Sequence, residues 1–384
     1  MELIAPSASP AAGTVRTEKI HALTGLRFLA AAMIVIHHSR GVLAIPKSFL
    51  AGVSLEHGVS FFFVLSGFIL AHVYRELPDH RAVARFFCAR FARVWPAHMF
   101  AFCAAFALGV HEAVAGGAHP GITIANAAMI HAWVPATAWF FSVNAVSWSI
   151  STEFFFYLAF PLLLAGFGRT WWWKLAIAAA LVAGAVIICE RLAIPSYADA
   201  APHAVNRAGL LYISPVTRLF EFVLGMLTAR VWITRAPVRT FSRAAATLAE
   251  IACVILCAAG VVFFSSRAAL TAVLGPNWTS YLGHAGAAPV FALLILVFAS
   301  QRGLLSRLFA HPVAVLLGEI SFSVYLLHQI MIRWLVSHRS DWAHLGETTV
   351  YIAFWAALLL ASWAVWRLVE TPARRALMRF APAQ

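Results

Sequence analysis

The sequence is poor in charge. Asp, Glu, Lys and Arg make up 11% of its 384 residues, whereas hydrophobic residues make up 62%. An average soluble domain has about 25% charged and about 45–50% apolar residues. A water-soluble fold cannot bury so much apolar surface, and a disordered chain needs low hydrophobicity with high charge. The composition therefore excludes both classes and indicates a helical protein that lies in a lipid bilayer.

Cysteine is scarce and a signal peptide is lacking. The five cysteines form no CxxC pair and most lie in apolar segments, which is typical of small buried side chains. We therefore expect neither disulfides nor a metal site. The first 20 residues lack the apolar stretch of a signal peptide. We expect them to form a cytoplasmic tail, with the first membrane helix retained as the targeting signal.

Long apolar segments dominate the rest of the chain. A helix needs about 20 mostly apolar residues to cross the hydrocarbon core. Ten segments approach that length: 22–40, 57–75, 94–111, 146–167, 172–189, 214–233, 246–264, 283–300, 314–336 and 348–369. The apolar stretch 121–134 is too short to cross and is expected to be interfacial or re-entrant. The sequence predicts an all-α fold, a polytopic transmembrane helical bundle of about ten spans.

The formal net charge of +13 reflects how the basic residues are distributed. Ten crossings place both termini on one side of the membrane. With that side cytoplasmic, 19 of the 28 Lys and Arg residues fall in cytoplasmic segments and seven in outer ones, as the positive-inside rule requires. We expect cytoplasmic tails at 1–21 and 371–384 around a transmembrane domain at 22–370. Basic runs interleaved with stacking aromatics are lacking, so nucleic acid is not an expected partner.

Two ionisable residues lie within the first span, where such groups are costly and usually functional. Arg27 and His38 are eleven residues apart, close to three helical turns, so they share a face about 16 Å apart along the axis. His37 points about 100° away. The alignment favours a shared polar channel. The alternative is that both side chains merely reach toward the membrane surfaces.

The fourth span carries a carboxylate near its outer end. Ser149, Glu153 and Tyr157 share one face, and the inward direction of this helix places Glu153 at about the depth of His38. A carboxylate at that level can orient an imidazole base. The alternative is that Glu153 only bonds to neighbouring Trp or Ser side chains.

Three further helices carry basic or polar residues that could have a function. Arg90 and Arg93 share a helical face at the cytoplasmic surface, and a pair of guanidinium groups suits phosphate; ordinary positive-inside topology is the alternative. Arg218 can pair with a carboxylate three residues on. In the ninth span, one stripe could form a hydrogen-bonding groove for a hydroxylated substrate, or could join helices. It comprises Ser321, Tyr325 and His328.

Seven short motifs resemble acyltransferase family 3, and they follow the family order over nearly the whole chain. They are LTGLRFLAAAMIVIHHS (23–39), GVSFFFVLSGFIL (58–70), RFARVWP (90–96), WSISTEFFFYLAFPLL (148–163), RLFEFVLGML (218–227), ISFSVYLLH (320–328) and WRLVETPARR (366–375). Two positions depart from the family. Thr24 stands where an Asp is common, and the common SVEE reads STEF, so that Glu153 alone remains of an acidic pair.

The resemblance implies a polytopic enzyme of the bacterial inner membrane. It would move an acyl group, usually acetyl, from cytoplasmic acyl-coenzyme A to a hydroxyl of an extracytoplasmic carbohydrate, without a metal. His38 and Glu153 would then be catalytic, and the donor would contact basic residues of the first and third spans. These are Arg27, Arg90 and Arg93. The acceptor would contact Ser149, Arg218, Ser321, Tyr325 and His328.

Three other classes remain open. A transporter or flippase could use the same intramembrane charges, although no inverted repeat is visible. The other large class of membrane-bound O-acyltransferases usually places its key His in a later span. A non-catalytic scaffold would not need Arg27 and His38 on one face. The sequence also leaves the acceptor open among lipopolysaccharide, exopolysaccharide, peptidoglycan, a Nod-type oligosaccharide and a macrolide.

Overall fold

The computed structural model describes residues 19–46, 48–111, 119–235 and 242–382. Within these ranges the chain is helical and contains no β-strand, which confirms the all-α expectation. Most of the expected N-terminal tail, and Lys47 of the first outer loop, lie outside the described residues. The longer helices are α1 (His21–Ser39), α2 (His57–Val73), α3 (His80–Ala107), α6 (Trp148–Leu164), α7 (Phe167–Arg191), α8 (Pro215–Arg235), α9 (Arg243–Ser265), α10 (Arg267–Ala285), α11 (Ala288–Phe298), α13 (Pro312–Ser337) and α15 (Glu347–Val365).

Short helices connect these elements. They are α4 (Pro120–Ala127), α5 (Thr137–Phe140), α12 (Leu304–Phe309), α14 (Arg339–Trp342) and α16 (Thr371–Met378). α4 covers the first part of the apolar stretch 121–134. At eight residues it is far too short to cross a bilayer, as the sequence predicts. A π-helical turn at Trp366–Glu370 joins α15 to α16.

Eight helical segments in the described part of the chain are long and apolar enough to cross a membrane. α2 has only 17 residues, and α3 carries its arginines along its first half. Including these two helices, each of the ten spans expected from the sequence overlaps a helical segment. The protein is therefore a polytopic helical bundle.

α10 is a long helix that the sequence does not predict. The expected spans 246–264 and 283–300 leave the residues between them as an outer loop, and this stretch contains Gly275 and Pro276, both of which interrupt helices. In the structure Gly275 takes a φ of 76°, and helical backbone lies on both sides of this kink. α10 and α11 together run from Arg267 to Phe298.

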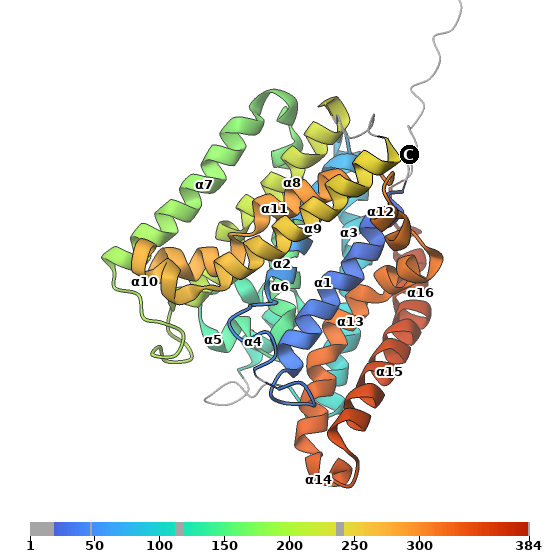
Figure 1. Ribbon diagram of the computed structural model, residues 1–384. Coiled ribbons are helices and arrows are strands. Elements are labelled where there is room, and N and C mark those ends of the chain that lie inside the picture. The colour runs from blue at the N-terminus through green and yellow to red at the C-terminus, as the bar shows by residue number, and fades with distance from the viewer. Residues whose placement is uncertain (1–18, 47, 112–118, 236–241, 383–384) are drawn as a thin grey trace, which may run out of the picture.

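Glycine allows the central helices to pack closely. α1 lies against α13, and α2 against α8 (Figure 1). A Cβ atom on Gly318 would overlap the carbonyl oxygen of Thr24, and one on Gly67 would overlap that of Phe222. Small residues at such crossings let helix backbones approach each other in a membrane. The α1–α13 contact places two polar helix faces side by side.

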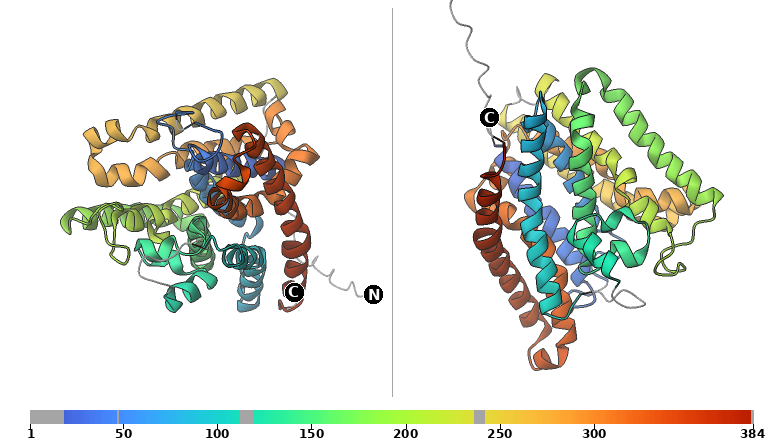
Figure 2. Two further views of the ribbon diagram at one scale, coloured as in Figure 1. Left: turned by 90° about the horizontal axis from the view of Figure 1, so that it is seen from below. Right: turned by 180° about the vertical axis from the view of Figure 1, so that it is seen from behind.

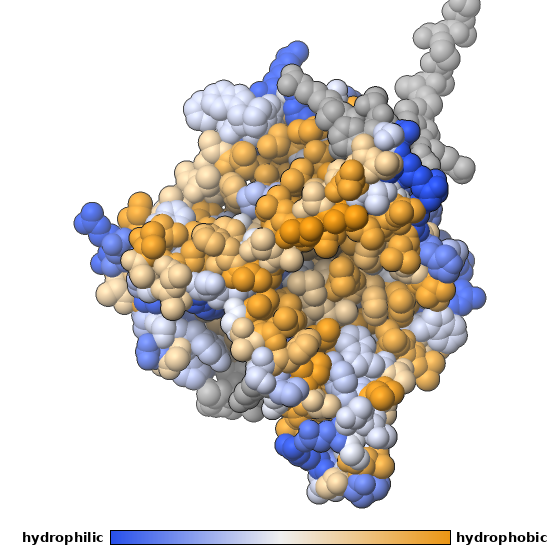
Figure 3. Space-filling model, viewed as in Figure 1, coloured by the Kyte–Doolittle hydropathy of each residue, from blue (hydrophilic) through white to orange (hydrophobic). Residues whose placement is uncertain are grey.

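The molecular surface has the pattern of a membrane protein. Hydrophobic residues cover the middle of the face in Figure 3, and hydrophilic residues gather at its margins, including the upper and lower ends. α7 and the α9–α10 segment lean away from the central helices (Figures 1 and 2). Large apolar side chains point outward from these peripheral helices and from α15, among them Ile255, Val273 and Leu360. A lipid environment accepts such a surface, whereas water would not.

The beginning and the end of the described chain lie at the same end of the bundle. The start of α1, α12 and the C-terminal end lie at the top of Figure 1, and α14 lies at the opposite end. The backbone N–H of Ala22 donates to the Gln301 side chain at 3.2 Å. Arg85, near the start of α3, donates to the carbonyl oxygen of Pro382 at 3.3 Å. This arrangement fits an even number of crossings.

Candidate active site

Most of the site residues expected from the sequence line one cavity. It has a volume of about 140 Å³ and lies between α1, α2, α3, α6 and α13. Residues from five separate segments of the sequence therefore meet in one place. Those that the sequence singles out and that line the cavity are Arg27, Arg90, Arg93, Ser149, Glu153, Tyr157, Ser321 and Tyr325.

The arginine pair of α3 faces the cavity. Because Asp79 caps the helix by accepting from the backbone N–H of Ala82 at 2.7 Å, α3 begins well before the apolar segment and carries both arginines. Arg93 Nη1 pairs with Glu370 Oε2 at 3.1 Å. Arg90 lies over the Tyr74 ring at 5.7 Å, and its buried Nε has no hydrogen-bond partner among the described residues.

Positive charge accumulates at this end of the cavity. Arg374 of α16 lies within electrostatic range of both Arg90 and Arg93. Arg27 also interacts with Arg93, a repulsion that Glu153 and Glu370 partly offset. Like charges so close together favour an anion among them. Sequence reasoning missed Glu370, although it is the acidic residue within the motif WRLVETPARR.

Glu153 is fixed by hydrogen bonds within the cavity. Its Oε1 accepts from the Ser66 hydroxyl at 3.0 Å and from the Tyr157 hydroxyl one helical turn further on at 2.7 Å. The expected face of α6 therefore exists. Among the described residues, the Glu153 carboxylate accepts hydrogen bonds from side chains of α2 and α6 and not from His38.

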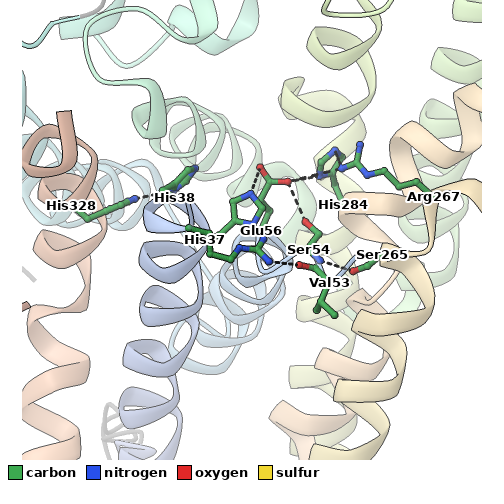
Figure 4. A network of polar contacts seen from close by, with 10 residues as sticks. His37, His38, Val53, Ser54, Glu56, Ser265, Arg267, His284 and His328 are labelled. Carbon is green, nitrogen blue, oxygen red and sulfur yellow. Dashed lines mark hydrogen bonds and ion pairs between the residues drawn. The ribbon is translucent and has the colours of Figure 1, made fainter. Parts of the chain in front are cut away.

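His38 instead contacts a second histidine. Its Nδ1 lies 3.0 Å from Nε2 of His328 on α13, and the two rings stack with centroids 5.2 Å apart (Figure 4). His328 is fully buried, and its Nδ1 lies 3.3 Å from the carbonyl oxygen of Val324. The polar stripe of α13 thus divides. Ser321 and Tyr325 line the cavity, whereas His328 contacts His38.

Tyr325 connects the cavity to this histidine pair. Its hydroxyl lies 2.8 Å from that of Ser149, and its ring centroid is 5.8 Å from that of His328. Side-chain contacts therefore run from the cavity through the Tyr325 ring and His328 to His38. The cavity lining itself does not include His38.

His37 points away from its neighbour, as the helical spacing predicts. The two rings are nearly perpendicular, at 87°, with centroids 5.4 Å apart. His37 Nε2 lies 3.4 Å from Glu56 Oε1, and its Nδ1 accepts from Arg40 at 2.7 Å. The carboxylate at this end of α1 is therefore Glu56 rather than Glu153, and it contacts His37 rather than the His38–His328 pair. The sequence offered one signal for it: Glu56 is the acidic residue of the first outer loop.

Arg218 lies apart from the cavity. Its Nε is 2.9 Å from Glu221 Oε2, and both side chains are fully buried in α8. Its guanidinium group lies over the Phe63 ring at 5.1 Å. The expected ion pair forms, but the structure does not bring Arg218 to the cavity wall.

Comparison with known proteins identifies the chain. A family model described as an acyltransferase domain, that of acyltransferase family 3, matches residues 20–367. The chain is 29% identical to "Acyltransferase MdmB" from Streptomyces mycarofaciens over 96% of its own length and 95% of that protein. It is 24% identical to "Putative O-acetyltransferase SACOL0978" from Staphylococcus aureus strain COL, and the aligned region covers 93% of the chain but only 57% of that relative.

No solved structure matches the chain. The family match covers nearly all of the sequence, and the relatives are named as acyltransferases. These findings favour the enzyme over the transporter and scaffold alternatives. The protein is a multi-pass membrane acyltransferase that transfers groups other than amino-acyl groups, and it belongs to acyltransferase family 3.

Proposed function

We propose that the protein moves an acyl group, acetyl, from cytoplasmic acyl-coenzyme A to a hydroxyl of an extracytoplasmic carbohydrate. The observation that carries this proposal is the row of groups from the arginine-lined cavity through Tyr325 and His328 to His38. The O-acetyltransferase name of the staphylococcal relatives supports transfer to oxygen. The proposal sets the protein in the bacterial inner membrane.

The donor end of the site consists of the three arginines of the cavity. Coenzyme A carries phosphates at its nucleotide end, and guanidinium groups can bond them bidentately. The unpaired Nε of Arg90 and the crowding of Arg93 with Arg374 fit an anion there. The pantetheine arm would run past Arg27, and its thioester would supply the activated acyl group.

The reaction requires a base for the acceptor hydroxyl, and the hydrogen bonds of His38 select its tautomer. The Val324 carbonyl oxygen can only accept, so Nδ1 of a neutral His328 carries the proton and its Nε2 accepts. His38 must then donate from Nδ1, which leaves its Nε2 with a free lone pair. His38 Nε2 takes the hydroxyl proton as the new C–O bond forms. The C–S bond breaks, and the proton passes to the departing thiolate.

In this proposal His328 positions His38. The sequence instead predicts that His328 contacts the acceptor. His328→Leu removes the acceptor for His38 Nδ1 and is expected to lower kcat by about 10- to 100-fold, as when the partner that orients a metal-bound histidine is removed. His328→Gln keeps an accepting oxygen and should retain most of the activity. The pH profile of kcat should shift in the Leu variant. Equal losses in both variants, with an unchanged pH profile, would indicate packing only.

The orientation of the protein has its own test. Because basic residues favour the side on which the N-terminus lies, we expect both termini in the cytoplasm. Reporter fusions at residues 10 and 380 should both give the cytoplasmic signal. An extracytoplasmic signal from either fusion would contradict the donor route, since acyl-coenzyme A would then face the wrong end of the cavity.

Mass spectrometry of surface glycans tests the whole function. Glycans from cells with and without the protein should differ by the mass of one acyl group per modified site, 42 Da for acetyl on the basis of its formula. Binding of acyl-coenzyme A to the purified protein provides an independent measurement. Unchanged glycans together with no donor binding would refute the proposal.

A further inference from the structure

A second polar space lies beside His37 at the end of α1 and takes no part in the donor route. This outer pocket has a volume of about 530 Å³ and is lined mainly by polar side chains. They come from the end of α1, the loop before α2 and the facing ends of α9 and α10. Those used below are His37, Arg40, Ser54, Glu56, Ser265 and Arg267.

The same two helices pass from the donor cavity to the outer pocket. On α1, Arg27 lines the cavity and His37 lines the pocket; on α2, Val59 lines the cavity, and Glu56 immediately before the helix lines the pocket. His38 follows His37 on α1 and lines neither space, and its ring faces His328 of α13. An enzyme that joins two substrates must hold both of them next to each other and next to the base, so each substrate needs its own binding space. The arrangement offers one space for each substrate.

Glu56 is the central acceptor of the outer pocket (Figure 4). Besides its contact with His37, its Oε2 accepts from Ser54 Oγ at 3.2 Å and lies 3.6 Å from Nδ1 of His284. Arg267 Nη2 lies 4.0 Å away. Burial raises the pKa of the Glu56 carboxyl, but the hydrogen bond from His37 and the electrostatic interactions with His284 and His37 outweigh burial and lower it below its ordinary value. Glu56 therefore faces the pocket as a carboxylate, with 23% of its side chain exposed.

The wall of the pocket is held rigid before any ligand arrives. Arg40 Nη1 donates to the carbonyl oxygens of Phe49, Leu50 and Val53, at 3.1 to 3.2 Å. The backbone N–H of Ser54 donates to Ser265 Oγ at 2.8 Å and so ties the loop to α9. These bonds occupy the Arg40 guanidinium group, so Arg40 is not available to bind an anionic ligand in the pocket. A preformed polar wall lowers the entropy cost of binding.

We infer that the outer pocket binds the acceptor as an uncharged polyhydroxylated ring, a carbohydrate, with Glu56 accepting hydrogen bonds from two neighbouring hydroxyls. This inference rests on the proposed function and adds the acceptor site to it. A carboxylate has two accepting oxygens and suits a pair of adjacent hydroxyls, and each charge-assisted bond is stronger than a neutral one. His37 lines the pocket and precedes His38 along α1, so a sugar ring bound there would lie close to the base.

Steady-state kinetics in nanodiscs test the assignment. The probe is the surface polysaccharide fraction extracted from cells that lack the protein, with acetyl-coenzyme A as donor. Glu56→Gln should raise the apparent KM for the polysaccharide at least tenfold, while kcat and the donor Kd change less than threefold. Arg267→Gln, which removes a partner of Glu56 without removing the carboxylate, should raise that KM about threefold. Glu347→Gln is the matched control, because Glu347 is an exposed carboxylate at the start of α15, paired with Arg339 at 3.5 Å.

The outcomes separate the two proposals. An unchanged acceptor KM in Glu56→Gln, or a lower kcat with the same KM, would overturn the acceptor site and leave the proposed function standing. Wild-type protein that neither binds acetyl-coenzyme A nor modifies the polysaccharide would refute the proposed function itself. If Glu56→Gln does not fold, the acceptor KM of Arg267→Gln decides, and a value equal to wild type would contradict the inference.

Discussion

His38→Ala is expected to lower kcat by about 10²- to 10⁴-fold, the usual cost of removing a positioned base. The acceptor hydroxyl would then have no group to take its proton, because His328 Nε2 points at His38 and its Nδ1 at the Val324 carbonyl. The donor Kd should stay near the wild-type value, since the arginines that would bind coenzyme A line a cavity that His38 does not. Transfer of radiolabelled acetyl to the polysaccharide, normalised to protein in the membrane, measures the loss.

His37→Ala provides the matched control for this loss. The two histidines are neighbours on α1, but their rings are nearly perpendicular and contact different partners. His37→Ala should act chiefly on the acceptor KM and leave kcat within a few-fold of wild type. If His37→Ala abolishes transfer and His38→Ala does not, the base has been assigned to the wrong ring. If neither variant loses activity, the mechanism fails.

Much of the fold could be predicted because membrane spans are recognisable by length and apolarity. The positions of α1, α6 and α13 follow from runs of about 20 apolar residues, and the polar residues within them stand out by their cost. α10 was missed because a glycine and a proline at its centre resemble a loop in sequence. The structure keeps helix on both sides of the kink, which local sequence rules do not anticipate.

The site could be predicted one helix at a time, but its pairings could not. The shared face of Ser321 and Tyr325 follows from helical periodicity, and both line the cavity. Which group faces His38 depends on how α1 packs against α13 and on how the loop before α2 folds back. The sequence predicts Glu153 at the depth of His38, yet its carboxylate accepts hydrogen bonds from Tyr157 and from Ser66 of α2. Glu56 lies in a loop, where periodicity gives no information.

Arg90→Ala and Arg93→Ala should each weaken donor binding by about 10- to 100-fold in Kd, which is the cost of about 1.5–3 kcal/mol for a hydrogen-bonded charge. Both arginines line the cavity, and their crowding with Arg374 fits a bound polyanion. Arg93→Ala also removes the salt-bridge partner of the buried Glu370 and leaves it only the Ser323 hydroxyl as a hydrogen-bond partner among the described residues, so this variant should lose more stability than Arg90→Ala. Isothermal titration of acetyl-coenzyme A into nanodisc-embedded protein gives the Kd, and thermal unfolding gives the stability.

Arg85→Ala distinguishes phosphate binding from a general effect of positive charge. Arg85 lies on the same helix, but it contacts the Pro382 carbonyl and does not line the cavity. Its removal should leave the donor Kd within twofold of wild type. Lys at position 90 or 93 should restore only part of the affinity, because an ammonium group keeps the charge but lacks the two-pronged geometry that matches a phosphate. Equal effects of all three alanine variants would mean that these arginines serve the topology of the protein alone, and the donor site would have to be sought elsewhere in the cavity.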